Sequence, residues 1–276
     1  MRILSSAALP SVARRALSTA SIGWSSSITF ATLGTAVTTL VLVPGLNVLF
    51  TVLLGADLAA NDTVRIGCAS ALIATLSSVA AGIVARVATD RWIGVFEYVC
   101  TARPVDAGYW LGAAAVPALL ASVTGLSNVG IVWLLSLTAP STGAASGLLI
   151  GAIALMPVAV LGGVCLGIFA AGLGLYLSDP YTGSNFLSII LPVSAGVIVP
   201  VSTYPGWLAW VCSWVPGSRL VQALDTSGSI ASSTTPNLFA LLATDAALAV
   251  LYAAIGLGLT VLAARRIRAG ARASLL

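Results

Sequence analysis

The chain has 276 residues; 59% are hydrophobic, only 7% are charged, and the formal net charge is +4. Soluble domains carry about 25% charged residues, so this composition, with a mean hydropathy of +1.07, predicts an integral membrane protein. Neither lysine nor histidine occurs. Their absence excludes a P-loop of the GxxxxGK[ST] type, a Ser-His-Asp triad and a histidine-ligated zinc site, and the small positive charge gives no reason to expect nucleic-acid binding.

Long apolar runs separated by short polar turns predict an all-α, polytopic protein that forms one transmembrane domain over residues 1–276. Each crossing needs roughly 20 apolar residues, and continuous rather than alternating runs argue against a β-barrel. Residues 1–27 are expected to form a cytoplasmic, partly amphipathic lead-in helix, and residues 264–276 a cytoplasmic tail. Six transmembrane helices are expected at about 28–54, 63–87, 109–137, 148–177, 181–199 and 237–263.

The stretch TDRWIGVFEYVCTARP, residues 89–104, lies between the second and third expected spans. It holds four of the chain's 20 charged residues, 12 basic and 8 acidic. Its apolar residues recur at helical spacing, and Pro104 ends the pattern. A segment this short and amphipathic is expected to lie along the membrane surface. Periodicity alone leaves open a plain interfacial helix and a docking surface for a partner protein.

Residues 200–236, between the last two expected spans, are rich in proline and tryptophan. The prolines break any continuous crossing, which predicts a re-entrant or interfacial element whose backbone is covered by protein. Trp207, Trp210 and Trp214 fall at i, i+3 and i+7, on one face of a short helix. They are either an aromatic belt or a gate over a transport path.

The arginines predict the orientation of the chain. With six spans, ten of the 12 arginines fall on one side, and only Arg65 and Arg219 fall on the other. By the positive-inside rule, both termini and residues 89–104 are cytoplasmic. Basicity from arginine alone, with abundant Ala, Gly and Val, is typical of a GC-rich coding sequence, so we expect a multi-pass protein of a bacterial cell membrane.

Three polar residues inside the expected spans are further candidates: Asn47, Asn128 and Asp245. An ionisable side chain within a span is costly and points to function by default. Asp245 is expected either to pair with Arg219 or Arg65, or to be the titrating group of an ion-coupled carrier or channel. The two asparagines are expected either to form hydrogen bonds between helices or to contact substrate.

These features in this order resemble the type-2 membrane family of ATP-binding-cassette exporter permeases. The first of two specific segments, RWIGVFEYVCTARPVDAGYWLG, is similar to the family's Gly-x-x-Glu … Pro … Gly pattern, although Arg103 stands where the family more often has Thr or Ala. The second, VPVSTYPGWLAWVCSWVPGSRLVQAL, is similar to its Pro … Tyr-Pro-x-Trp-Leu … Pro pattern. The matching residues are Gly94, Glu97, Pro104 and Gly112 in the first segment, and Pro200, Tyr204, Pro205, Trp207, Leu208 and Pro216 in the second.

The resemblance implies the non-catalytic permease subunit of an efflux pump, in which two permease copies, as a homodimer or heterodimer, work with two cytoplasmic ATPase subunits. ATP and Mg²⁺ would be bound by the ATPase and no cofactor by this chain. The expected substrate is amphiphilic or lipid-like: a drug such as an antibiotic, a natural product, a peptide or a glycolipid. The implied coupling residues are Asp90, Arg91, Trp92, Phe96, Glu97, Cys100 and Arg103, and the implied outer gate is Tyr204, Pro205, Trp207, Trp210, Trp214 and Pro216.

Overall fold

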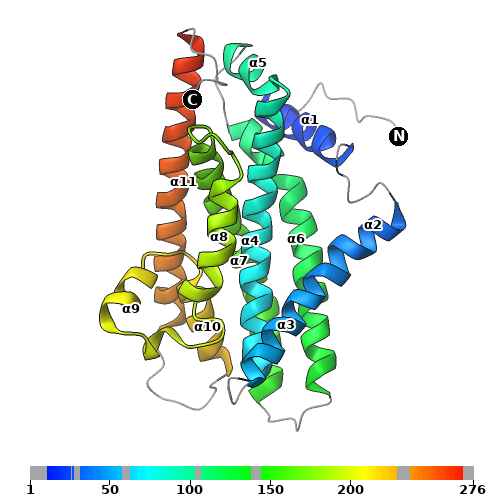
Figure 1. The fold of residues 1–276 in the computed structure, drawn as a ribbon, viewed down its shortest axis with the longest axis vertical. Helices are drawn as coiled ribbons and strands as arrows, with labels where there is room; N and C mark the ends of the chain where they lie inside the picture. The colour runs from blue at the N-terminus through cyan, green and yellow to red at the C-terminus, as the bar shows by residue number, and fades with distance from the viewer. Residues whose placement is uncertain are drawn as a thin grey trace.

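The computed structural model describes residues 11–25, 27, 32–57, 63–102, 107–137, 144–228 and 237–269. Every regular element in this part of the chain is a helix (Figure 1). The elements are α1 (Ser11–Ser25), α2 (Leu33–Val37), the π-helical turn η3 (Thr38–Leu42), α3 (Val43–Asp57), α4 (Thr63–Trp92), α5 (Val95–Ala102), α6 (Ala107–Ser136), α7 (Ala144–Gly174), α8 (Thr182–Ser194), the 3₁₀ turn η4 (Val201–Thr203), α9 (Gly206–Cys212), α10 (Ser218–Gly228) and α11 (Leu238–Arg268).

Five stretches of helix are long and apolar enough to cross a membrane, and each coincides with an expected span. They are Leu33–Asp57, Thr63–Trp92, Ala107–Ser136, Ala145–Gly174 and Leu238–Arg268. Large apolar side chains also cover the outside of the bundle, such as Phe50 on α3 and Val250 on α11. An apolar exterior around an apolar interior is typical of a helical bundle in lipid.

The expected span at 181–199 corresponds to α8, which is only 13 residues long. At 1.5 Å per residue such a helix is about 20 Å long, short of the roughly 30 Å hydrocarbon core. The chain turns after α8 at Gly196, whose φ of +70° lies in the left-handed region that ends many helices. The topology with six full spans therefore stays a prediction.

Two helices extend several residues beyond the expected spans. α4 continues to Trp92, past the expected span end near residue 87, so it takes in the first residues of the stretch 89–104. α11 continues to Arg268, into the expected tail at 264–276. In each extension an arginine donates to carbonyls elsewhere in the bundle: Arg91 to those of Gly174 and Leu177, and Arg268 to that of Cys100. The lead-in segment is helical as expected, with α1 over Ser11–Ser25.

α7 packs closely against α4 through glycines spaced as G-x-x-x-G. A Cβ atom added to Gly163 would lie 2.5 Å from the Leu76 carbonyl oxygen, and one on Gly167 would lie 3.0 Å from the Ala80 Cα. Small residues at this spacing let membrane helices approach backbone to backbone. α4 and α7 thus form the centre of the bundle.

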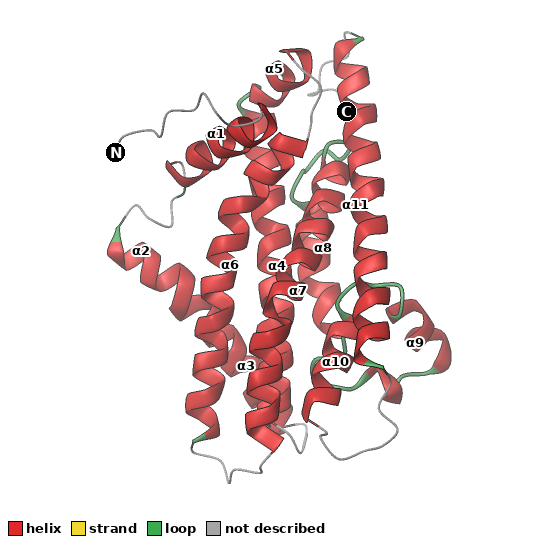
Figure 2. Ribbon diagram, turned by 180° about the vertical axis from the view of Figure 1, so that it is seen from behind, coloured by secondary structure: helices red, strands yellow, loops and turns green. Residues whose placement is uncertain are grey.

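The two ends of the bundle carry different short helices (Figures 1 and 2). α5, α1 and the last turns of α11 lie at one end, which we call the α5 end. α9 and α10 lie toward the other end, which we call the α10 end. Each end has its own group of buried apolar side chains around the shared α4–α7 contact.

Candidate functional site

At the α5 end the chain turns sharply between α4 and α5. Gly94 has a φ of +76°, and its N–H donates to the Arg91 carbonyl at 3.1 Å. Glycine adopts this left-handed conformation without a steric penalty. The helix expected at 89–104 is therefore not continuous: residues up to Trp92 belong to α4, and the separate short helix is Val95–Ala102.

The outward side of this corner is aromatic and apolar. Trp92, Ile93 and Tyr98 are 69%, 67% and 76% exposed. On the opposite side of α5, Phe96 and Cys100 are fully buried in one apolar cluster with residues of α4 and α11. α5 is therefore fixed to the bundle by its inner face, while Tyr98 on this helix and Trp92 and Ile93 at the corner are exposed.

Two charged residues predicted to face a partner point inward instead. Asp90 is buried; its Oδ2 accepts a hydrogen bond from the Tyr109 hydroxyl at 3.0 Å, and its Oδ1 lies 3.3 Å from Nη2 of Arg86. Arg91 donates from Nη1 to the carbonyls of Gly174 and Leu177 at 2.7 and 2.8 Å. These side chains join the end of α4 to α6 and α7.

The remaining predicted coupling residues lie at different depths. Glu97 is half-buried. Burial raises the pKa of the Cys100 thiol to about 11, while Arg268 lowers it and Glu97 raises it further. This cysteine is therefore a protonated packing residue at neutral pH and a poor nucleophile. Arg103 lies outside the described residues.

The turn between α7 and α8 lies beside the α5 corner. The Trp92 and Tyr181 rings meet edge to face with centroids 5.6 Å apart. Within this turn, Asp179 Oδ1 accepts a hydrogen bond from the Tyr181 N–H at 2.9 Å. The Tyr176 hydroxyl donates to the Leu259 carbonyl of α11 at 3.1 Å. The α5 corner and this turn thus form one surface over the ends of α4, α7, α8 and α11.

At the α10 end, the proline- and tryptophan-rich stretch breaks into η4, α9 and α10. The Tyr204 hydroxyl donates to the Val193 carbonyl at 2.9 Å, which holds the chain back against α8. Pro205 is the residue before the first turn of α9, and Pro216 is buried before α10. The described part of residues 200–236 is thus a set of short helices, as the prolines predict.

Three tryptophans of this region lie on the outside of the molecule. Trp207, Trp210 and Trp214 are 70%, 64% and 50% exposed, and the last two rings meet edge to face with centroids 6.0 Å apart. α9 lies beside the bundle rather than across its end (Figures 1 and 2). Exposed indoles in this position fit an aromatic belt at a membrane surface better than a plug over a closed path.

Asp245 holds the beginning of α10. Its carboxylate is buried and accepts the Gly217 N–H at 3.0 and 3.3 Å, together with the backbone N–H of Arg219. A carboxylate at a helix N-terminus binds N–H groups that have no partner within the helix and complements the helix dipole. The expected ion pair with Arg219 is not seen: within the described part of the chain, Nη1 of Arg219 is buried without a hydrogen-bond partner, and Asp245 bonds to the backbone at Gly217 and Arg219 instead.

Arg65 pairs with Asp225, a partner that the sequence did not predict. Arg65 Nε lies 2.7 Å from Asp225 Oδ1 and Nη2 lies 3.0 Å from Oδ2, a two-pronged ion pair. Arg65 also donates to the carbonyls of Val197 and Gly196, at 3.1 and 3.3 Å. One side chain thus joins α4, α10 and the turn after α8.

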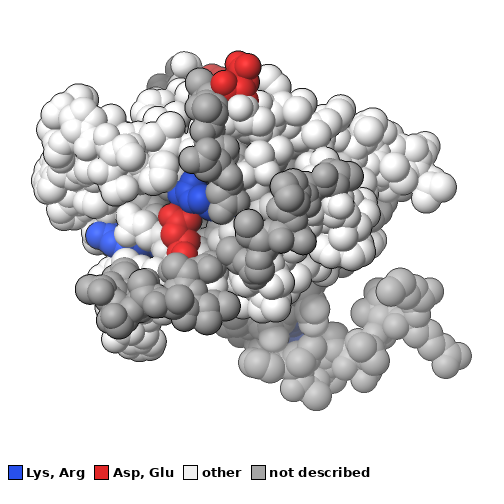
Figure 3. Space-filling view, turned by 90° about the horizontal axis from the view of Figure 1, so that it is seen from below, with Lys and Arg blue, Asp and Glu red and all other residues white. Residues whose placement is uncertain are grey.

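Figure 3 shows the α10 end from below. The described surface there is mostly uncharged, with blue and red atoms side by side near its centre.

The two intramembrane asparagines differ in burial. Asn47 is exposed on the outer face of α3. Asn128 is fully buried on α6, and within the described part of the chain neither its Oδ1 nor its Nδ2 has a hydrogen-bond partner. One expectation was that Asn128 forms a hydrogen bond between helices. It forms none to any described residue.

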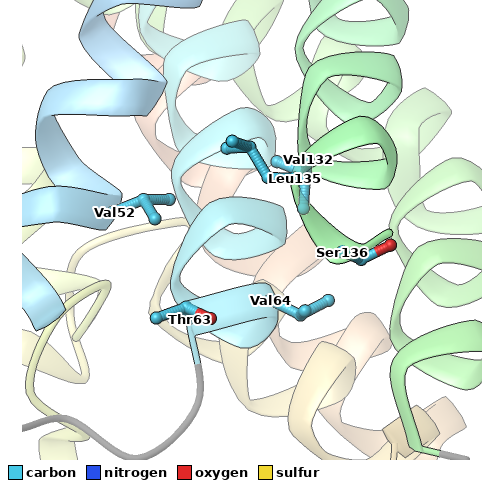
Figure 4. A pocket seen from close by; sticks show the side chains of 6 residues that line it. All are labelled: Val52, Thr63, Val64, Val132, Leu135 and Ser136. Atoms are coloured by element: carbon cyan, nitrogen blue, oxygen red, sulfur yellow. The ribbon is translucent and has the colours of Figure 1, made fainter. Parts of the chain in front are cut away.

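A small, partly open space lies between α3, α4 and α6 (Figure 4). Its volume of about 20 Å³ accommodates one water molecule, whereas a site for a drug-sized ligand needs about 300–1,000 Å³. This space therefore cannot hold an amphiphilic substrate. It is lined by Val52, Thr63, Val64, Val132, Leu135 and Ser136.

Polar but uncharged side chains are exposed on three helices, α3, α4 and α8. Ser78 is exposed on α4, Asn47 on α3, and Asn185 and Ser188 on α8. Figure 1 shows α4 at the front, with α8 on one side and α3 crossing it on the other. Polar groups that face outward here are better matched to a protein or substrate surface than to lipid tails.

Among the described residues, no three His, Cys, Asp or Glu side chains are grouped so that they could hold a metal ion. In comparisons with known proteins, no family model matches the chain and no curated protein matches it.

Proposed function

We propose that the chain is the transmembrane subunit of an ATP-driven exporter and works as a dimer with two copies of a cytoplasmic ATPase. The observation that carries this proposal is the α5 corner. A short helix is fixed to the ends of α4 and α11 while Trp92, Ile93 and Tyr98 remain exposed. A short helix that is fixed to the bundle beside exposed aromatic side chains is suited to dock into a groove of another protein.

The charges support the same orientation. Arg14 and Arg15 of α1 and Arg265 and Arg266 of α11 lie at the α5 end, which the positive-inside rule assigns to the cytoplasm. Because the sequence has no lysine for a P-loop, ATP and Mg²⁺ would be bound by the partner. In this proposal, closure of the ATPases moves α5, and the movement passes into the spans.

The substrate would pass between two copies rather than through one. The space between α3, α4 and α6 has room for only one water molecule, and the exposed polar side chains lie on α3, α4 and α8. A surface of apolar and uncharged polar groups favours an amphiphilic or lipid-like substrate over an ion. The stretch from Tyr204 to Pro216 would then border the path at the α10 end.

An ion-coupled carrier with Asp245 as its titrating group is the second candidate. Burial of this carboxylate within α11 supports it. Its hydrogen bonds to the start of α10 support a structural role instead. Transport that collapses with an uncoupler yet survives ATP depletion would favour the carrier, and the opposite result would favour the exporter.

Docking can be tested by crosslinking from the exposed face of α5. In a variant with Tyr98→Cys, a bifunctional thiol reagent should capture a co-expressed P-loop ATPase encoded beside this chain. The native Cys100 is a built-in control because it lies on the same helix but is fully buried. Trp207→Cys, at the α10 end, should capture no ATPase. If Tyr98→Cys never captures the ATPase and transport survives ATP depletion, the exporter proposal is wrong.

A further inference from the structure

The end of α5 is joined to α11 by one side chain. Arg268 Nε donates to the Cys100 carbonyl at 2.7 Å. Cys100 lies in the last turn of α5, where the carbonyls have no partner within the helix. A positive charge there also complements the negative end of the helix dipole. Arg268 therefore caps α5 from a different helix, 168 residues further along the chain.

Apolar packing brings the same two elements together. Phe96 and Cys100 of α5 share a buried cluster with Ala263, Ala264 and Ile267 of α11. These three residues occupy the last turns of α11, next to Arg268. The inner face of α5 thus rests on the end of α11, and the Arg268 hydrogen bond closes the same contact at its edge.

The connection between α5 and α4 is less constrained. The corner consists of Ile93 and Gly94, and a Cβ atom added to Gly94 would meet nothing within 4 Å. The space beside Gly94 is thus open, and the direction of α5 depends on its inner face, which packs against α4 and α11, and on its cap. Arg91, in contrast, fixes the end of α4 to the end of α7.

We propose that Arg268 is a positioning residue that holds α5 against the end of α11, so that α5 and α11 move as one unit. A displacement of α5 then passes into the whole length of α11 as well as into α4. The attachment itself can be tested on the chain alone; its role in transport rests on the proposed function.

Hydrogen–deuterium exchange of the purified full chain in lipid nanodiscs tests the attachment. Arg268→Ala should speed exchange of the α5 amides about tenfold, the factor expected from losing one hydrogen bond to a charged group. Arg268→Lys should recover most of the protection, because an ammonium group can donate to the same carbonyl. Arg265→Ala is the matched control: it removes a charge from the same turn of α11 and should leave α5 unchanged.

The outcomes separate this inference from the exporter proposal. If Arg268→Ala leaves α5 exchange unchanged, or if Arg265→Ala speeds it equally, the attachment is overturned. With the co-expressed ATPase, Arg268→Ala should retain crosslinking at Tyr98→Cys but transport less per ATP hydrolysed, and Arg268→Lys should restore it. Faster exchange with wild-type transport would overturn the positioning role. Failure of Tyr98→Cys to capture an ATPase would instead count against the proposed function and leave the exchange result standing.

Discussion

The α5 end and the α10 end both carry a short helix with exposed aromatic residues, yet the two helices are attached in different ways. α5 is fixed by a buried face and by a cap from Arg268, and the end of the bundle where it lies carries several arginines. α9 lies beside the bundle, with tyrosine hydrogen bonds at its flanks: Tyr204 to the Val193 carbonyl and Tyr252 to the Trp214 carbonyl. Exposure alone does not mark a docking surface. Only a rigidly attached helix can pass a displacement on to the helices against which it packs.

The charged residues at the two ends join different elements. At the α5 end, Arg91 and Arg268 donate to backbone carbonyls of other elements, and Arg86 lies beside the buried Asp90. At the α10 end, Arg65 pairs with Asp225, and Asp245 caps a buried helix start. The α10 end should therefore lose more stability when one charge is removed, and the α5 end should lose more function.

The largest effect is expected for Asp245→Ala. It leaves the backbone N–H groups at the start of α10 without a partner in the protein interior. We expect a loss of about 3 kcal/mol in unfolding free energy, the cost of breaking a buried charged interaction. Thermal unfolding in detergent measures it. An unchanged melting temperature with abolished transport would favour the ion-coupled carrier.

The next effect tests the ion pair at the α10 end. Arg65→Ala removes hydrogen bonds to both α10 and the turn after α8, whereas Asp225→Ala leaves the hydrogen bonds from Arg65 to that turn in place. We expect losses of about 2 kcal/mol for Arg65→Ala and about 1 kcal/mol for Asp225→Ala, because both groups are partly exposed to solvent. The double variant should resemble Arg65→Ala. Equal effects of the two single variants would show that the carbonyl contacts contribute nothing.

A smaller effect is expected at the α5 end for Tyr109→Phe. It removes the hydroxyl that donates to the buried Asp90, at a cost of about 1 kcal/mol for one hydrogen bond. Tyr98→Phe is the matched control, because Tyr98 is 76% exposed, and it should leave the melting temperature unchanged. Equal shifts for the two variants would contradict the inward position of Asp90.

The smallest effect on the fold is expected from thiol chemistry on α5. Because burial raises the pKa of Cys100 from 9.0 to about 11, its reactive thiolate is scarce at pH 8 and increases as the pH rises toward 11. Maleimide should label Cys100 at least about tenfold more slowly than a cysteine at position 98.

The folded state favours the neutral thiol of Cys100. The contribution of this thiol to the free energy of unfolding is therefore present below pH 9 and is lost as the pH rises to about 11. Fast labelling of Cys100 at pH 8 would show that α5 does not keep its inner face buried.

The long spans could be predicted from the sequence because transfer of long apolar runs into lipid dominates their energetics. The contacts at the two ends could not. Periodicity shows which residues share a helix face but not which face meets protein, and the family resemblance, which implied that Asp90 and Arg91 face a partner, carries no information on their contacts in this chain. Arg65 and Asp225 are 160 residues apart, and nothing in their surrounding sequence marks them as a pair. One available signal was missed: the G-x-x-x-G spacing of Gly163 and Gly167 indicates the α4–α7 contact.

The glycines of α7 let its backbone approach two neighbouring helices, α4 and α11, closely. α4 lies against Gly163 and Gly167, and on α11 a Cβ atom added to Gly172 would lie 2.5 Å from the Gly256 carbonyl oxygen. Backbone-to-backbone contacts have few interlocked side chains, so small sliding movements of the helices need no change of rotamer. The contacts of α7 therefore allow α4 and α11, the two helices against which α5 packs, to slide past it.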